Sequence, residues 1–460
     1  MMELATPDAG QAASSIPADG RKSVRRMAIP CIDADTIFDV TVEDGLFASI
    51  RPTGDRADSA GPGGQAEVPT LWPAYTECHA HVALPPNFDD SLDDPAIVAM
   101  QYLYHGVAHV VDMFGFPLVK AAWERSAALA TLPYPEVAHC GYAVTAMCGY
   151  DGKIGHGSEF PAPIFMLGGK HDLDVILDGN RHLGATFLKV MFTDGVEQPG
   201  GSPRLSRISP ELLAALAQVA SARGISCVLD CNTRDEVMLA HRFGFRYFAH
   251  AVRDVVLSDA DWQQLSGSCF VSTLSGLRPM VLQREEFLDE YGRPGFPDTQ
   301  DTSNLAFVAG IDEPFGIKRN CQESRTRAVE TMRQNSLAAL ERGMLLVGTD
   351  AGNGGCFHGY SLLGELRLLG ARPDAANLPL QTVATVTGRQ FFDRMAGHAS
   401  PAHPLRVGAA ATFNLFSRHG HAAGGLPDAT VIRGIPVDRQ LVVKTIQALR
   451  ASPTQGKITL

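Results

Sequence analysis

Residues 68–82 read VPTLWPAYTECHAHV, an apolar run that leads into two histidines two positions apart. If the run forms a β-strand, side chains alternate between its two faces, and His79 and His81 point to the same side. Two imidazoles on one wall can chelate a single divalent metal ion. A pair of this kind also arises by chance, so its meaning depends on the rest of the chain.

The sequence after this motif has the pattern of repeated strand–helix units. From about Trp72 to Phe392, short apolar runs alternate with longer segments of helical periodicity. In the clearest unit, Ser209 is a candidate N-cap and Pro210 the first helical residue, and Gly224 ends the helix before the next apolar run. Such alternation is typical of parallel sheets in α/β folds.

The two ends of the chain instead contain short runs of β-forming residues. Residues 36–42 are one example, and residues 411–416 and 429–432 are others. We therefore predict that both ends pair into one small β domain beside an α/β barrel. The predicted division is a disordered leader (1–27), a small β domain (28–70 plus 404–445), a barrel (71–403) and a C-terminal tail (446–460).

Composition argues against several classes of partner. A net charge of −11 argues against a nucleic-acid or anionic-membrane surface, and no run of 18 apolar residues is present to span a membrane. Nine cysteines without a CxxC pair indicate reduced thiols in a cytoplasmic protein, and residues 1–27 lack the apolar core of a signal peptide. We expect a small-molecule substrate, no nucleic acid, no membrane and a homo-oligomer.

Candidate metal ligands recur where predicted strands end. In parallel α/β barrels the chemistry lies at the C-terminal ends of the strands, so side chains there are brought together. A lysine at the inner end of an apolar strand is costly to bury without a special role. The series in chain order is His79, His81, Lys189, Asp230, His250 and Asp350.

Several segments are similar to motifs of the metal-dependent amidohydrolase superfamily. The resemblance extends over about residues 28–445. Within the superfamily, the chain is similar to the branch that contains imidazolonepropionase-like enzymes and Xaa-Pro or Xaa-Arg dipeptidases. The similar segments are residues 76–82 (the first-strand HxH), 106–113, 141–145, 184–190, His250, 348–352 (the eighth-strand GTDAG), and 358–366 with 384–388 (a helix pair).

The resemblance implies a distorted (β/α)8 TIM barrel with a small β-sandwich-like domain built from both chain ends. It implies one or two divalent ions per chain, with zinc expected, held on one side by His79, His81 and Asp350. Lys189 as an ammonium has no lone pair for a metal, and the resemblance implies that CO2 carboxylates it to a bridging carbamate. The implied reaction is hydrolysis of a C–N bond in an amide, small peptide or cyclic amide. A metal-bound hydroxide would attack, and Asp350 would move the proton to the leaving nitrogen.

The main departure from the family lies on the fifth strand. Residues 228–232 read VLDCN, and Asp230 stands where the family has a metal-binding histidine. Asp230 could bind the second ion beside His250 through oxygen, leave that position weak so that one ion binds, or contact the substrate. Tyr150 stands where this branch often has a histidine, and it could offer its phenol to a substrate carbonyl or simply pack.

This departure leaves other functions open. They are a deaminase, a lactonase or a non-hydrolytic lyase on the same scaffold, and, in another class, a metal-poor inactive barrel that serves binding or assembly. His358 is a further candidate for substrate binding. An insertion at residues 278–321 carries several aromatic residues, so it could cover an apolar substrate or pack on a neighbouring subunit.

Overall fold

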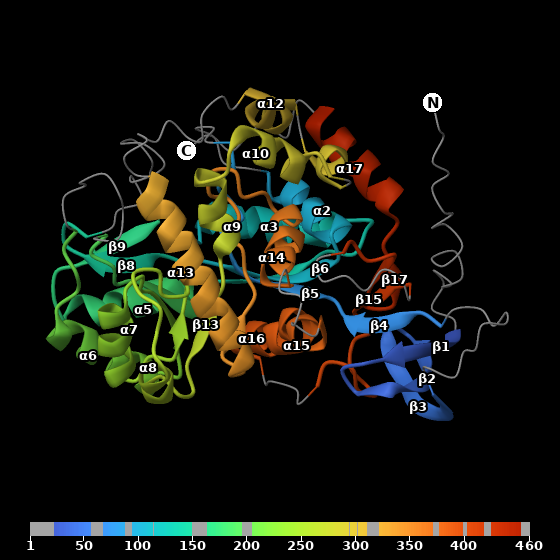
Figure 1. Cartoon of the computed structure of the whole chain (residues 1–460), viewed down its shortest axis with the longest axis horizontal. Helices are drawn as coiled ribbons and strands as arrows, with labels where there is room; N and C mark the ends of the chain where they lie inside the picture. Colours follow the sequence, from blue (N-terminus) through green and yellow to red (C-terminus); the bar gives the residue numbers. More distant parts are fainter. Residues whose placement is uncertain are drawn as a thin grey trace.

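The computed structural model shows an α/β protein whose strands form three sheets (Figure 1). None of the helices in the described parts of the chain combines the length and apolar character needed to cross a membrane. The residues that the structure describes are 23–56, 68–87, 94–113, 115–149, 163–195, 205–293, 295–300, 302–310, 322–370, 377–398, 403–417 and 425–451.

One sheet joins the two ends of the chain. Its order is β17-β16-β15-β4-β1-β2-β3, so strands from the C-terminal part lie beside strands from the N-terminal part. The bounds are β1 (Ser23–Ile29), β2 (Asp33–Glu43), β3 (Leu46–Arg56), β4 (Thr70–Pro73), β15 (Phe413–Phe416), β16 (Ala429–Ile432) and β17 (Ile435–Pro436). Phe47, Leu71 and Phe413 are among the residues of its apolar core. This sheet lies at one end of the molecule in Figure 1.

The other two sheets are parallel. One has the order β14-β13-β12-β11-β10-β8-β9 and the other β5-β6-β7. The bounds are β5 (Tyr75–Ala80), β6 (Val107–Asp112), β7 (Glu136–His139), β8 (Ala143–Ala146), β9 (Ile164–Leu167), β10 (Phe187–Met191), β11 (Ser226–Asp230), β12 (Tyr247–Phe248), β13 (Cys269–Val271) and β14 (Leu345–Leu346). The α/β class predicted from the sequence is confirmed.

Backbone hydrogen bonds link the two parallel sheets at two places. Beside β14, the amide of Cys78 donates to the carbonyl of Val347 (3.1 Å). Just before β10, the amide of Thr186 donates to the carbonyl of His139 at the end of β7 (3.2 Å). The carboxyl ends of β5 and β14 are therefore held side by side.

Helices surround the parallel strands. The helix α6 has the predicted start, because Ser209 accepts a hydrogen bond from the amide of Leu212 and Pro210 is the first helical residue. The α-helices are α2 (Pro95–Tyr104), α3 (Pro117–Leu129), α5 (Asp172–His182), α6 (Pro210–Ala222), α7 (Arg234–Arg242), α8 (Asp259–Gln264), α9 (Leu274–Leu277), α10 (Arg284–Tyr291), α11 (Phe296–Thr299), α12 (Thr302–Gly310), α13 (Gln322–Glu341), α14 (Tyr360–Gly370), α15 (Asn377–Thr382), α16 (Gly388–Met395) and α17 (Arg439–Ala451).

The helix α17 was not predicted. It crosses residue 445, where the sequence interpretation ended the small β domain and began a tail. Val442 and Ile446, one turn apart, are its fully buried residues, and α17 packs against α2 (Figure 1). Because only one narrow face of α17 is buried, its apolar pattern in the sequence is short and does not indicate a helix clearly.

The insertion at residues 278–321 packs on its own chain where it is described. Phe287, Tyr291 and Phe296 are buried in one cluster with Phe357 and Tyr360. The Tyr291 hydroxyl also donates to the carbonyl of Gly355. These aromatic side chains therefore support the segment that follows β14; residues 311–321 lie outside the described part of the chain.

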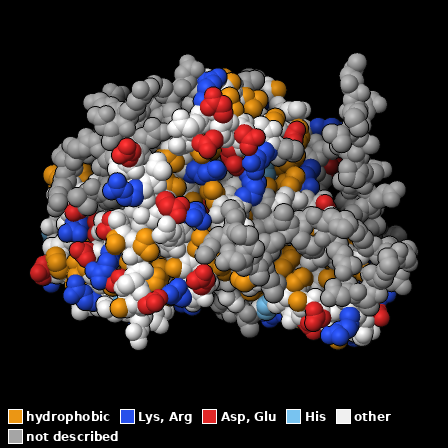
Figure 2. All heavy atoms as spheres, in the orientation of Figure 1, with side chains coloured by type: hydrophobic (Ala, Val, Ile, Leu, Met, Phe, Trp, Pro, Cys, Tyr) orange, Lys and Arg blue, Asp and Glu red, His pale blue; other side chains and the backbone are white. Residues whose placement is uncertain are grey.

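Among the described residues on the face shown in Figure 2, basic and acidic side chains are interspersed. Ion pairs among the described residues include Arg223 with Asp178 and Arg367 with Glu290.

Candidate metal centre

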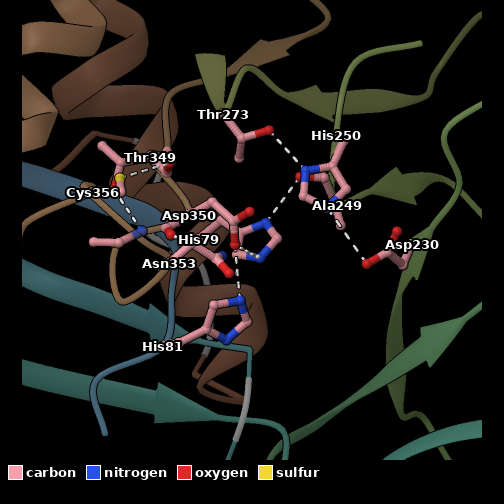
Figure 3. A network of polar contacts seen from close by, with 12 residues as sticks. His79, His81, Asp230, Ala249, His250, Thr273, Thr349, Asp350, Asn353 and Cys356 are labelled. Carbon is pink, nitrogen blue, oxygen red and sulfur yellow. Dashed lines mark hydrogen bonds and ion pairs between the residues drawn. The ribbon is translucent and has the colours of Figure 1, made fainter. Parts of the chain in front are cut away.

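Three predicted metal ligands converge where β5 meets the segment after β14. His79 lies in β5, His81 follows it, and Asp350 follows β14. The Nε2 atoms of His79 and His81 lie 3.2 Å and 2.8 Å from Oδ1 of Asp350. One potential ligand atom from each residue lies within 4.8 Å of the others. Figure 3 shows the three side chains pointing toward a common space.

The backbone around Asp350 is specialised for this position. Its φ of 68° is in the left-handed region, which few residues other than glycine, asparagine and aspartate adopt. The amide of Asp350 donates to the carbonyl of His79 (2.8 Å), so the two ligand-bearing segments are tied directly. Gly276 makes room, because a Cβ atom there would lie 2.8 Å from Cβ of Asp350.

The hydrogen bonding of His79 fits a bound cation. Its Nδ1 lies 2.9 Å from the carbonyl oxygen of Ala249, which can only accept, so Nδ1 carries the proton. A neutral ring then has its lone pair on Nε2, and that buried atom has no hydrogen-bond partner. Yet Nε2 lies 3.2 Å from a carboxylate oxygen of Asp350. Two acceptor atoms facing each other at this distance are the arrangement that a shared metal ion stabilises.

The pKa values give the same protonation state. Burial lowers the pKa of His79 and of His81 to about 4. Burial alone would raise the pKa of Asp350, but the charges and hydrogen bonds of the two histidines hold it well below its usual value. Near neutral pH the group therefore consists of two neutral imidazoles and one carboxylate, which is the form that binds metal.

Glu77 holds these two segments together, and the sequence interpretation gave it no role. Its carboxylate is fully buried and accepts hydrogen bonds from the amides of His79 (3.2 Å) and Thr349 (2.9 Å) and from the Thr349 hydroxyl (2.7 Å). Burial raises the pKa of Glu77 to about 8. The available signal was an acidic residue within a buried strand, because such residues are rarely buried without partners.

The other three predicted ligands form a second cluster. Lys189 lies in β10, Asp230 ends β11 and His250 follows β12. Oδ2 of Asp230 lies 3.3 Å from Nζ of Lys189 and 3.4 Å from Nε2 of His250. All three side chains are buried. Figure 3 shows Asp230 and His250 facing each other.

In this second cluster Lys189 and Asp230 make a buried ion pair. Burial alone would raise the pKa of Asp230, but the Lys189 and His250 charges hold it below its usual range. The ammonium of Lys189 has no lone pair for a metal. Without modification of Lys189, the ligand atoms that this cluster can offer to a metal ion are therefore the Asp230 oxygens and the His250 nitrogen.

The two clusters adjoin. The rings of His79 and His250 have centroids 4.9 Å apart, and the carbonyl that fixes His79 belongs to Ala249, the residue before His250. The structure thus brings all six predicted ligands into one region.

Of the two residues predicted to contact the substrate, the structure describes only His358. Tyr150 is outside the described residues. His358 is buried, with Nε2 3.1 Å from the carbonyl oxygen of Leu84 and Nδ1 3.2 Å from the hydroxyl of Tyr102. Both ring nitrogens of His358 thus face protein atoms, and its role toward a substrate stays a prediction.

Sequence comparison gives no relative for this chain: no family model matches it, and no curated protein matches it. Solved structures match over nearly its whole length. A Xaa-Pro dipeptidase with bound methionine in the active site matches with a TM-score of 0.65 and 14% identity, covering 91% of this chain and 100% of the other.

Two further structures match similarly. Bottromycin amidohydrolase has a TM-score of 0.65 and 21% identity over 96% of this chain and 92% of its own. Ochratoxinase of A. niger has a TM-score of 0.62 and 16% identity over 90% and 95%. The chain therefore has the fold of these amidohydrolase-type proteins.

Proposed function

We propose that this protein is a metal-dependent hydrolase that cleaves a C–N bond of an amide, a small peptide or a cyclic amide. The observation that carries the proposal is the convergence of His79, His81 and Asp350 at the carboxyl ends of parallel strands, where barrel enzymes place their chemistry. Structures of the same fold include a Xaa-Pro dipeptidase, an amidohydrolase and a phenylurea hydrolase.

We interpret the two parallel sheets as a distorted (β/α)8 barrel, supported by the backbone hydrogen bonds that link them beside β14 and beside β10. The sheet that joins the chain ends would be the small β-sandwich-like domain. We also propose a small-molecule substrate, a cytoplasmic location and a homo-oligomer; the eight described cysteines, all of them free thiols, support a reducing compartment.

His79, His81 and Asp350 would hold one divalent ion, with zinc expected. Asp230 and His250 would hold a second ion if Lys189 is carboxylated, because a carbamate adds the missing oxygen donors. When bound, such an ion polarises the substrate carbonyl and lowers the pKa of a water molecule.

Asp350 is the group placed to move the proton. Its side chain is 17% exposed, whereas that of His79 is fully buried, so Asp350 is the member of its cluster that a substrate can reach more easily. Its carboxylate would accept the proton of the attacking water and deliver it to the leaving nitrogen.

The Lys189–Asp230 ion pair favours a second candidate function. If Lys189 remains an ammonium, one ion would bind, and a single-ion reaction such as deamination would fit the site.

Elemental analysis of protein purified without chelator tests the proposal. We expect one to two divalent transition ions per chain, and turnover in a screen of N-acyl amino acids, dipeptides and aryl amides that a chelator abolishes and zinc restores. His79→Ala should lose the metal, whereas His171→Ala, whose side chain is 81% exposed, should keep it. Only trace metal in the wild-type protein, with no activation by Zn, Mn, Fe, Co or Ni, would contradict the proposal.

A further inference from the structure

The short helix α9 begins in an unusual way. Its N-cap residue, Thr273, has φ 47° and ψ 33°, a left-handed conformation that β-branched residues rarely adopt. Threonine at this position commonly accepts a hydrogen bond from the first turn. Thr273 makes no such bond. Its Oγ1 lies instead 2.8 Å from Nδ1 of His250.

A residue from another helix caps α9 in its place. Glu365, which lies in α14 and is fully buried, accepts hydrogen bonds from the amide of Leu274 (2.9 Å) and the amide of Ser275 (2.7 Å). These are the first two amides of α9, which have no acceptor within the helix. The distant carboxylate therefore does the work that the Thr273 hydroxyl would ordinarily do.

The geometry also fixes what Thr273 faces. Figure 3 shows its hydroxyl directed at one edge of the His250 ring, with Asp230 beyond the opposite edge. Nε2 of His250 lies 3.4 Å from Oδ2 of Asp230. A partner on Nδ1 sets the orientation and the tautomer of a ligating imidazole.

We propose that Glu365 is a positioning residue that acts through Thr273 on His250. By capping α9, it leaves the Thr273 hydroxyl available to hold the His250 ring with Nε2 directed at the metal position beside Asp230. The inference rests on the proposed function only in treating His250 as a metal ligand.

Loss of the Glu365 carboxylate has a definite local consequence. In Glu365→Gln one carboxylate oxygen becomes an NH2 group, which cannot accept, so the amide of Leu274 or of Ser275 would be buried without an acceptor. Such a group recruits any acceptor within reach. The Thr273 hydroxyl is the ordinary N-cap acceptor for this helix. It would turn to its own helix, and His250 would lose the partner of Nδ1.

A double-mutant cycle tests this chain of contacts. Glu365→Gln and Thr273→Ala should each weaken binding of the ion beside Asp230 by roughly 10–100-fold, the range for lost partners of metal-ligating residues. The double variant should be no weaker than either single variant, because both changes remove the same contact. Thr273→Ser, which keeps the hydroxyl, should bind zinc like the wild type.

A second readout does not need metal. In protein with ¹⁵N-labelled histidine, assigned with His250→Gln, the ring nitrogen signals of His250 should shift alike in Glu365→Gln and Thr273→Ala. Glu290→Gln is the control, because Glu290 is a partly buried carboxylate that pairs with Arg367 and with Arg278 at the C-terminal end of α9 and not with the first α9 amides. It should leave these signals unchanged even if it lowers stability.

The outcomes separate this inference from the proposed function. Unchanged His250 signals in Glu365→Gln, or additive losses of zinc affinity in the cycle, would overturn the positioning role. Wild-type protein that binds no metal would contradict the proposed function, while the ring signals would still test the contact. If Glu365→Gln fails to fold, Glu365→Asp, whose shorter side chain retreats from the α9 amides, gives the same ring readout.

Discussion

On the β5–β14 side of the candidate centre, three side chains have the protonation state and the spacing of metal ligands. On the β10–β12 side, an ammonium and a carboxylate face each other, with one histidine beside them. Both groups lie at the carboxyl ends of parallel strands and both are largely buried. Position in the fold therefore gathers the residues, but the chemical form of each side chain decides whether a group can bind a metal.

The difference centres on Lys189 and Asp230. His79, His81 and Asp350 need no modification to act as ligands, whereas Lys189 must first lose its charge and gain carboxylate oxygens. Breaking a buried ion pair by removing one partner is costly because the other charge stays buried. Folding stability is therefore expected to be more sensitive to the loss of Lys189 or Asp230 than to a change in the first cluster. The following variants test how each side contributes to turnover and metal binding.

The largest effect among the variants is expected from Asp350→Asn. The amide keeps the shape of the side chain but is not a base, so turnover should fall by roughly 10²–10⁴-fold while the protein still folds. Steady-state kinetics with circular dichroism measures this, and Asp259→Asn, whose side chain is 94% exposed, is the control. An unchanged rate would show that another group carries the proton.

The next largest effect on turnover is expected from Lys189→Ala. If Lys189 carries the proposed carbamate, its removal should lower turnover by roughly 10²–10³-fold, comparable to the loss of a preorganised electrostatic contact, and release the ion of the second cluster. Added acetate or propionate should restore part of the turnover and part of the metal content, because a free carboxylate can occupy the place of the carbamate oxygens.

Metal content and rate are measured with and without the added acid, and Lys120→Ala in α3, where Lys120 pairs with Glu124, is the control. Near-normal turnover and metal content in Lys189→Ala would remove the bridging role.

A smaller and more informative effect is expected at Asp230. If Asp230 binds the second ion, Asp230→Ala should lower the affinity for that ion by roughly 10–100-fold. Asp230→His, which introduces the residue found in the resembling family, should keep the ion but favour Zn over Mn, since a carboxylate is the harder ligand. An anomalous-scattering map with Asp230 directed away from every metal peak would refute ligation.

The sequence could predict which residues gather but not how their atoms meet. Strand-end positions and the family resemblance placed His79, Lys189 and Asp350 in one region, and Ser209 with Pro210 located the start of α6. The position of Glu77 in an apolar strand signals that it needs a partner, but the sequence does not show that this partner is Thr349, 272 residues away. The same holds for Glu365, whose contacts with α9 exist only once α14 is packed.

The smallest effect is expected from Gly276→Ala, which disturbs the β5–β14 side without removing any ligand. The added methyl group would lie 2.8 Å from Cβ and 3.0 Å from Oδ2 of Asp350, closer than real contacts allow, so Asp350 must shift by a few tenths of an ångström. Because a misplacement of 1 Å can cost about 10²-fold, this shift should lower turnover about tenfold.

Gly179→Ala in α5 is the matched control for Gly276→Ala, since a Cβ there meets nothing within 4 Å and alanine favours a helix. It should leave turnover unchanged. Metal stoichiometry then locates the damage caused by Gly276→Ala. Loss of the ion beside Asp350, with the ion beside Asp230 retained, would show that the two sides bind independently. Loss of the ion beside Asp230 instead would show that α9, which also carries the Thr273 contact, couples them.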